Sequence, residues 1–179
     1  MNINKNYLNL NDSYLFSLIN KKVNEYKLQN PEKEVIRLGI GDVTLPLPPA
    51  VIDAMSKAVS EMGSAEYFKG YGEEQGYSFL RKAISGYYKQ KNVDLDENEI
   101  FISDGAKSDL GNILDIFDVN NTVIIPDPVY PVYVDTNIMA GRKIIFINGN
   151  MQNNFLPMPD EELSGDIVYL CSPNNPTGA

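Results

Sequence analysis

The turn Gly105-Ala106-Lys107 carries residue types suited to binding an anion. It lies between the apolar run 100–102 and a helical pattern, so its backbone N–H groups are expected at a helix N-terminus. Small residues let a phosphate approach the backbone, and Lys107 adds a positive charge. The alternative, which composition alone favours, is that Gly105 only permits a tight turn and Lys107 is solvated.

Two later turns carry side chains that could hold a flat, oxygen-bearing ligand. Tyr130 lies between Pro128 and Pro131, which stiffen its loop, so its ring could stack on a heterocycle. Asn175 lies in an Asn-Asn-Pro turn, and its amide could bond a ring hydroxyl or phenolate. The alternatives are a loop aromatic that covers the edge of the core and an asparagine that caps the next helix.

Two glycine-bearing loops come earlier in the chain. Gly39-Ile40-Gly41-Asp42 would let a ligand carboxylate approach backbone N–H groups. It is not a dinucleotide fingerprint, because the third glycine and the strand-to-helix context are missing. Gly70-Tyr71-Gly72 places a glycine-flanked tyrosine ahead of a helical pattern, and taken alone it could be only a turn.

Helical and strand patterns predict the elements that position these turns. Apolar residues recur at helical spacing from Leu15 to Tyr26, where Asp12 or Ser13 could cap the helix and Asn30-Pro31 ends it. Further helices are expected after Pro48-Pro49, from about Tyr77, over 110–117 and after Pro131. Continuous apolar runs predict strands at 34–38, 100–102, 123–125, 144–147 and 167–170.

The later strands alternate with helices, which predicts an α/β fold with a mainly parallel sheet flanked by helices. Ligands of such sheets bind at the carboxyl ends of the strands. The turns at 103–107, 127–131 and 172–178 each follow a predicted strand. We therefore expect all of them at one edge of the sheet.

Composition excludes several classes of function. The 179 residues carry a net charge of -9, with 24 acidic and 15 basic side chains, which argues against a nucleic-acid partner. No apolar stretch or signal core predicts membrane insertion or export. The chain has no histidine, so it holds no histidine-based triad or imidazole-based zinc site. Cys171 is the one cysteine, which fits a reducing cytoplasm, and we expect it in the core, after a buried strand.

Taken together, the turns resemble the N-terminal portion of fold-type I, pyridoxal-phosphate-dependent aminotransferases, and specifically the LL-diaminopimelate aminotransferases. The resemblance runs from Tyr14 to Ala179 with its motifs in order. The motifs are Gly39–Asp42, Gly70–Gly76, Ser103–Asp109, Asp127–Asp135 and Ser172–Gly178.

The resemblance implies a role for each matching residue. Those that contact pyridoxal 5'-phosphate would be Ala106 and Lys107 at one end, Tyr130 on the ring and Asn175 at the phenolic oxygen. Tyr71 would reach the cofactor phosphate of a partner subunit in a homodimer with shared active sites. Substrate-binding residues would be Tyr14, Gly41, Glu66, Lys107, Tyr130 and Asn175, with Glu66 reading the distal ammonium of the substrate.

The resemblance also implies a reaction and a catalytic residue that this chain does not contain. It is transamination of tetrahydrodipicolinate by glutamate to give LL-diaminopimelate and 2-oxoglutarate, a step of lysine biosynthesis. The Schiff-base lysine would lie beyond Ala179, so no catalytic residue is assigned here. We expect an inactive fragment, with 1–48 as an N-terminal segment and 49–179 as the first part of the large domain, truncated after the strand ending at Cys171.

Other functions stay open at this point. One is a related aminotransferase acting on aspartate, alanine or an aromatic amino acid. Another is a short protein that binds phosphate ligands without catalysis. The joint presence of cofactor-stacking and cofactor-bonding turns argues against this second alternative.

Overall fold

The computed structural model describes residues 1–10, 15–39, 41 and 43–179. They form two compact units. One joins Met1–Leu15 to Ser103–Ala179, and the other is Phe16–Ile102. The predicted boundary at residue 48 stays a prediction.

A parallel sheet forms the centre of the first unit. Its order is β2-β1-β3, with β1 at Val123–Asp127, β2 at Ile144–Asn148 and β3 at Ile167–Val168. Both neighbours run parallel to β1. The predicted mainly parallel sheet is confirmed for this part of the chain.

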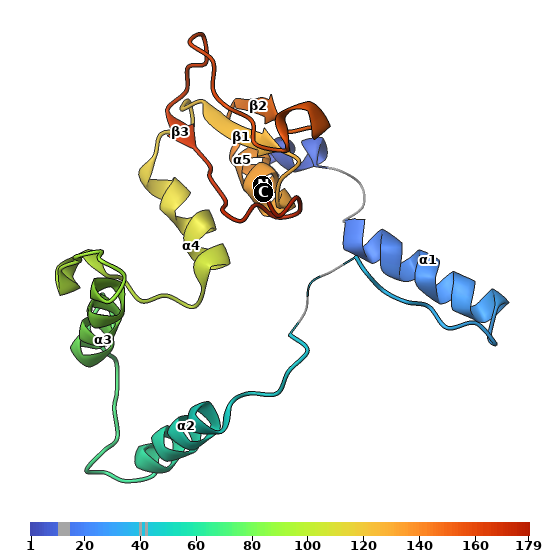
Figure 1. Ribbon diagram of the computed structural model, residues 1–179. Helices are drawn as coiled ribbons and strands as arrows, with labels where there is room; N and C mark the ends of the chain where they lie inside the picture. The colour runs from blue at the N-terminus through green and yellow to red at the C-terminus, as the bar shows by residue number, and fades with distance from the viewer. Residues whose placement is uncertain (11–14, 40, 42) are drawn as a thin grey trace. The chain divides into compact units, whose positions relative to one another are not determined.

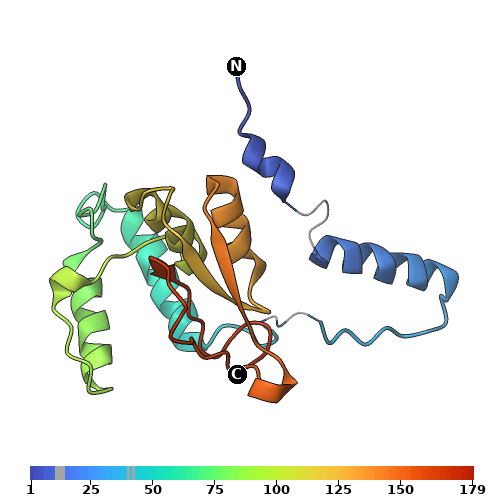
Figure 2. The same cartoon turned by 90° about the horizontal axis from the view of Figure 1, so that it is seen from above.

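Helix α5, Pro131–Ala140, connects β1 to β2 and packs beside the strands (Figures 1 and 2). It begins with a proline, whose missing N–H costs nothing at this position, and ends at Gly141, whose φ of 79° suits glycine. Between helix and sheet lies the core of this unit. Its buried members are Leu114, Val123, Ile125 and Tyr169, with Tyr133, Val134, Ile144 and Ile167 packed against them.

Shorter helices complete the first unit. They are α4 at Ala106–Asn112 and the 3-10 helices η1 at Lys5–Asn9, η3 at Ile113–Ile116 and η4 at Met151–Asn153. Buried Arg142 holds the end of η3, because its Nη2 donates to the carbonyl oxygens of Leu114 and Phe117 at 2.6 and 2.8 Å. Asn4 ties the N-terminal segment to α5 by donating to the carbonyl oxygen of Met139 at 2.9 Å.

The second unit is helical. It contains most of α1 at Leu15–Gln29, then α2 at Pro49–Met62, α3 at Ser78–Lys89 and the 3-10 helix η2 at Glu97–Glu99. The helices predicted from Leu15 to Tyr26, after Pro48-Pro49 and from about Tyr77 are thereby confirmed. The helix predicted over 110–117 is instead the end of α4 followed by the 3-10 helix η3. The proposed cap residues Asp12 and Ser13 lie outside the described residues.

Three strand predictions need correction. Residues 34–38 and 100–102 form no strand in the described chain, and the N–H of Ile102 pairs instead with the carbonyl oxygen of Gln75 at 2.9 Å. An apolar run becomes a strand only beside a partner strand. The predicted buried strand at 167–170 is regular only over β3, and Val168 and Leu170 are 53% and 82% exposed.

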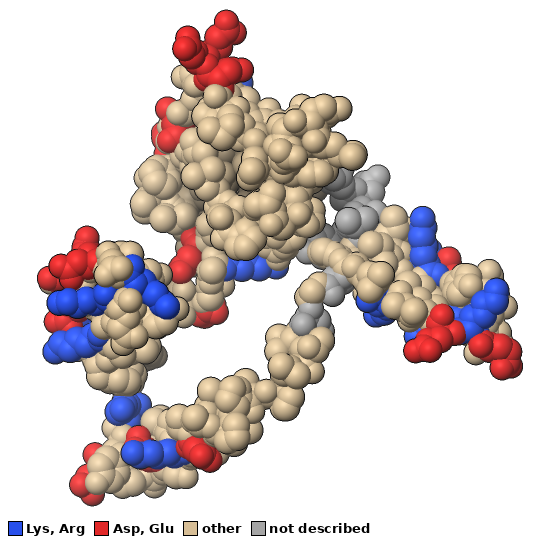
Figure 3. All heavy atoms as spheres, viewed as in Figure 1, with Lys and Arg blue, Asp and Glu red and all other residues tan. Residues whose placement is uncertain are grey.

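Charged side chains of both signs are interspersed on the helices, while the exposed acids Asp160, Glu161 and Glu162 gather on the long loop before β3 (Figure 3). Among the described residues, no helix has the length and apolar character needed to cross a membrane.

Candidate functional site

The turn before α4 is organised around Ser103. Its hydroxyl donates to Asp109 Oδ2 at 2.7 Å and accepts the N–H of Gly105 at 3.2 Å. Gly105 adopts φ 138°, which side chains rarely tolerate, and no atom lies within 4 Å of where a Cβ would be. Ala106 then opens the helix and Lys107 is exposed, so the first N–H groups and a lysine share one open turn.

The position of this turn differs from the prediction. Since residues 100–102 form no strand, the turn 103–107 follows none of the sheet's strands. The turns after β1 and β3 do lie at the expected carboxyl end. No hydrogen bond among the described residues joins Lys107 to Tyr130 or Asn175.

The turn after β1 places Tyr130 at the start of α5. Tyr130 is the cap residue and is half-buried, and its carbonyl oxygen accepts the N–H of Tyr133 at 3.2 Å. The ring of Tyr133 meets that of Tyr130 edge-on, with centroids 5.9 Å apart and planes at 87°. Tyr130 therefore has an aromatic neighbour on the helix side.

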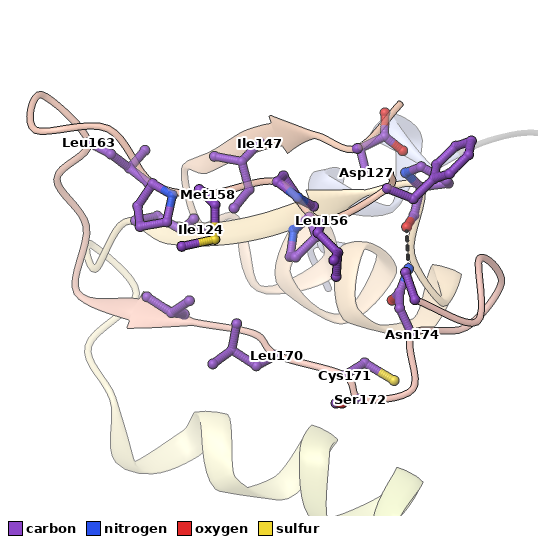
Figure 4. Close-up of a pocket in the computed structure, with 18 of the residues that line it drawn as sticks. Ile124, Asp127, Ile147, Leu156, Met158, Leu163, Leu170, Cys171, Ser172 and Asn174 are labelled. Carbon is purple, nitrogen blue, oxygen red and sulfur yellow. Dashed lines mark hydrogen bonds between the residues drawn. The ribbon is translucent and has the colours of Figure 1, made fainter. Parts of the chain in front are cut away.

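The turn after β3 is fixed by Asn174, a residue that sequence reasoning missed. Its Nδ2 donates to the carbonyl oxygen of Pro128 at 3.0 Å (Figure 4). The same nitrogen also donates to Thr177 Oγ1 at 2.9 Å. Its backbone N–H and carbonyl bond Ala179 and Gly178, both at 2.7 Å. The first asparagine of the pair thus holds the turn, while Asn175 is exposed. The doubled asparagine was the available signal.

The other predicted site residues belong to other parts of the chain. Gly41, Glu66 and Tyr71 belong to the second unit, and all are exposed. Glu66 donates its backbone N–H to Ser64 Oγ at 3.3 Å. The residue is exposed. Tyr14 lies outside the described residues.

A cavity of about 700 Å³ lies beside the joined turns (Figure 4). Its wall is mainly apolar and is completed at one end by Asp127, Ser172 and Asn174. Of the predicted site residues that the structure describes, none lines it. Its apolar members include Ile124, Ile147, Leu156, Met158, Leu163 and Leu170. Cys171 also lines it and is half-buried, so its predicted core position is only partly met.

Burial changes the ionisation of two side chains on α5. Burial, followed by a hydrogen bond with Cys171 and repulsion from Cys171, Tyr130 and Tyr169, raises the pKa of Tyr133 above 10.0. Tyr133 therefore stays neutral well into alkaline solution. Burial also raises the pKa of Asp135 above 3.8.

Comparisons with known proteins identify the family of the chain. The profile "Aminotransferase class I and II" matches residues 33–179. An LL-diaminopimelate aminotransferase of Lachnospira eligens is 55% identical over 99% of this chain and 47% of its own length. Another, of Desulfosudis oleivorans, is 52% identical over 99% of this chain and 46% of its own.

The solved L,L-diaminopimelate aminotransferase of Chlamydomonas reinhardtii is 38% identical, with a TM-score of 0.85 over 98% of this chain and 46% of that one. The chain thus spans about half the length of the relatives it matches. The resemblance found in the motifs is confirmed, as is the α/β fold of the chain. The chain belongs to the class I and II aminotransferase family.

Proposed function

We propose that this chain supplies part of the cofactor- and substrate-binding region of an LL-diaminopimelate aminotransferase. The enzyme would convert tetrahydrodipicolinate and glutamate to LL-diaminopimelate and 2-oxoglutarate. The observation that carries this proposal is the 52–55% identity, across nearly the whole chain, to curated relatives of that name.

The donor set of the turns fits pyridoxal 5'-phosphate. The open turn at Ala106 and Lys107 offers N–H groups and a cation to the phosphate end. Tyr130 offers a ring for stacking, and the exposed amide of Asn175 offers a donor to the phenolic oxygen. When bound, the cofactor would supply an electron sink for charge that develops at the substrate α-carbon.

The substrate and partner assignments rest on position and exposure. Gly41 would let a substrate carboxylate approach the backbone, and the carboxylate of Glu66 would attract a distal ammonium group. Tyr14 completes the proposed substrate set. The exposed Tyr71 supports a homodimer in which it reaches the partner's cofactor phosphate. We also infer action in the cytoplasm, because a single cysteine forms no internal disulfide.

The test of the reaction is an amino-donor comparison with the protein isolated from its source. LL-diaminopimelate and 2-oxoglutarate should yield glutamate faster than aspartate, alanine or tyrosine does as donor. A clear preference for one of those other donors would overturn the substrate assignment. The assignment of the chain to the aminotransferase family would still hold.

Cofactor binding is tested separately on the chain itself. Lys107→Ala should weaken pyridoxal phosphate binding by roughly tenfold, because a charge-assisted contact to phosphate is lost. Lys91→Ala removes a lysine of the second unit and serves as the control. Equal affinity of both variants and the unmodified chain would contradict the role of Lys107.

A further inference from the structure

Three tyrosine rings form a continuous contact, here called the tyrosine column: Tyr130, Tyr133 and Tyr169. Tyr133 is its middle member. Its ring stacks on that of Tyr169, with centroids 4.9 Å apart and planes at 24°. Its edge-on contact with Tyr130 completes the column.

The inner end of the column is fixed in the core. Tyr169 is 7% exposed, and its hydroxyl accepts Asn137 Nδ2 at 3.2 Å. Asn137 is fully buried and also donates to the carbonyl oxygen of Tyr133 at 2.8 Å. Tyr169, which directly follows β3, contacts the ring of Tyr133, and Asn137 of α5 bonds its backbone carbonyl, so Tyr133 is held from two directions.

The outer end of the column is held differently. The prolines flanking Tyr130 restrict its backbone, but they leave the rotation of its side chain open. Since an edge-to-face arrangement is a preferred geometry for aromatic pairs, the fixed ring of Tyr133 favours one orientation of Tyr130. We propose that Tyr133 is a positioning residue that sets the Tyr130 ring for contact with a flat cofactor.

This inference rests on the proposed role of Tyr130, and its first test needs no cofactor. In protein with isotopically labelled tyrosine rings, nuclear magnetic resonance detects the ring signals of Tyr130. These signals are assigned by their disappearance from the spectrum of Tyr130→Phe. Tyr133→Leu should shift these signals, because the neighbouring ring is removed. Tyr133→Phe keeps the ring and should leave them near their original positions. Unshifted signals in Tyr133→Leu would overturn the inference.

The second test measures pyridoxal phosphate affinity by titration of the full chain. Tyr133→Leu should weaken binding roughly fivefold, as expected for loss of one aromatic pair. Tyr133→Phe should stay within about twofold. If Tyr133→Leu does not fold, Tyr133→Met replaces it, since methionine fills a similar space flexibly.

The chain offers a matched control on α3. Tyr87 and Tyr88 also meet edge-on, at 5.9 Å and 89°. Tyr87→Leu removes the same kind of pair in the other unit and should leave affinity unchanged.

Tyr130→Ala separates the two proposals. If it leaves affinity unchanged, the stacking role of Tyr130 is wrong and the inference falls with it. If it weakens binding while Tyr133→Leu does not, the positioning role alone is overturned.

Discussion

The side-chain amide of Asn174 and the carbonyl oxygen of Pro128 are joined by a hydrogen bond of 3.0 Å. The bond connects the turn after β3 to the turn after β1, across 46 positions of sequence. It brings the loops that carry Tyr130 and Asn175 to one edge of the sheet. Of the two neighbouring asparagines, Asn174 is therefore the one that holds the turn.

Asn174→Ala should destabilise the chain by about 1 kcal/mol, because the side-chain bonds to Pro128 and Thr177 are lost. Urea unfolding measures the change, and hydrogen exchange should quicken in 172–179. Asn175→Ala is the matched control. It should leave stability nearly unchanged and weaken pyridoxal phosphate binding. An equal loss of stability in the two variants would contradict the expectation that Asn174, and not Asn175, holds the turn.

Gly76→Ala should be strongly destabilising. Gly76 adopts φ 95°, and an added Cβ would lie 2.4 Å from Cγ1 and 2.6 Å from Cβ of Ile102. The strain and the clash together should cost about 2 kcal/mol or more. Gly86 lies inside α3, where a Cβ meets nothing within 4 Å. Gly86→Ala should instead stabilise by about 0.5–1 kcal/mol in the same thermal melts.

Arg81→Lys should loosen the loop 73–76 although it keeps the charge. Arg81 is buried, pairs with Glu73, and donates through Nε to the carbonyl oxygen of Gly76 at 3.1 Å. A lysine cannot reproduce this planar set of donors, so we expect a loss on the order of 2 kcal/mol and faster exchange in the loop.

Lys82 supplies the control for that change. It forms a surface pair with Glu97 at 3.9 Å. Lys82→Ala should alter the unfolding free energy by less than about 1 kcal/mol. A loss in Lys82→Ala as large as that in Arg81→Lys would contradict the expectation that the buried donor set of Arg81 contributes more to stability than a surface ion pair does.

The raised pKa of Asp135 predicts a pH-dependent effect of Asp135→Asn. The folded state holds the carboxyl proton to higher pH than the unfolded state does, since burial disfavours the carboxylate. This contribution is present below pH 3.8 and is lost as the pH rises through the folded-state pKa. Asp135→Asn should therefore raise the urea midpoint at pH 7 and leave it almost unchanged at pH 3. A larger gain at pH 3 would contradict the assignment.

Helices were the most predictable part of the fold, because their signals are local. Proline before α2 and α5, and apolar spacing in α3, each act within a few residues. Strands depend on partners elsewhere in the chain, which is why residues 34–38 and 100–102 were misassigned. The exposure of Leu170 was missed for the same reason, since an apolar run does not reveal which of its faces is covered.

The candidate site shows the same limit. The motifs predicted Lys107, Tyr130 and Asn175 as site residues through residue type and order, and these roles stay predictions. Pattern alone did not distinguish the asparagine that holds the turn from the one that faces outward, because that choice depends on the carbonyl of Pro128. The contact between Tyr133 and Tyr169 likewise exists only once β3 lies beside β1.

The central position of β1 has a consequence for the timing of folding. β1 meets β2 across the single helix α5, whereas Thr122, just before β1, bonds Asp166, just before β3, over 44 positions. Closing a longer loop costs more entropy, about 0.6 kcal/mol for each doubling of length. The β1–α5–β2 segment should therefore assemble first, with β3 joining late. The Asn174 bond and the stacking of Tyr169 would then form only in the last step, so the sheet edge that carries Tyr130 and Asn175 is completed after the scaffold that supports it.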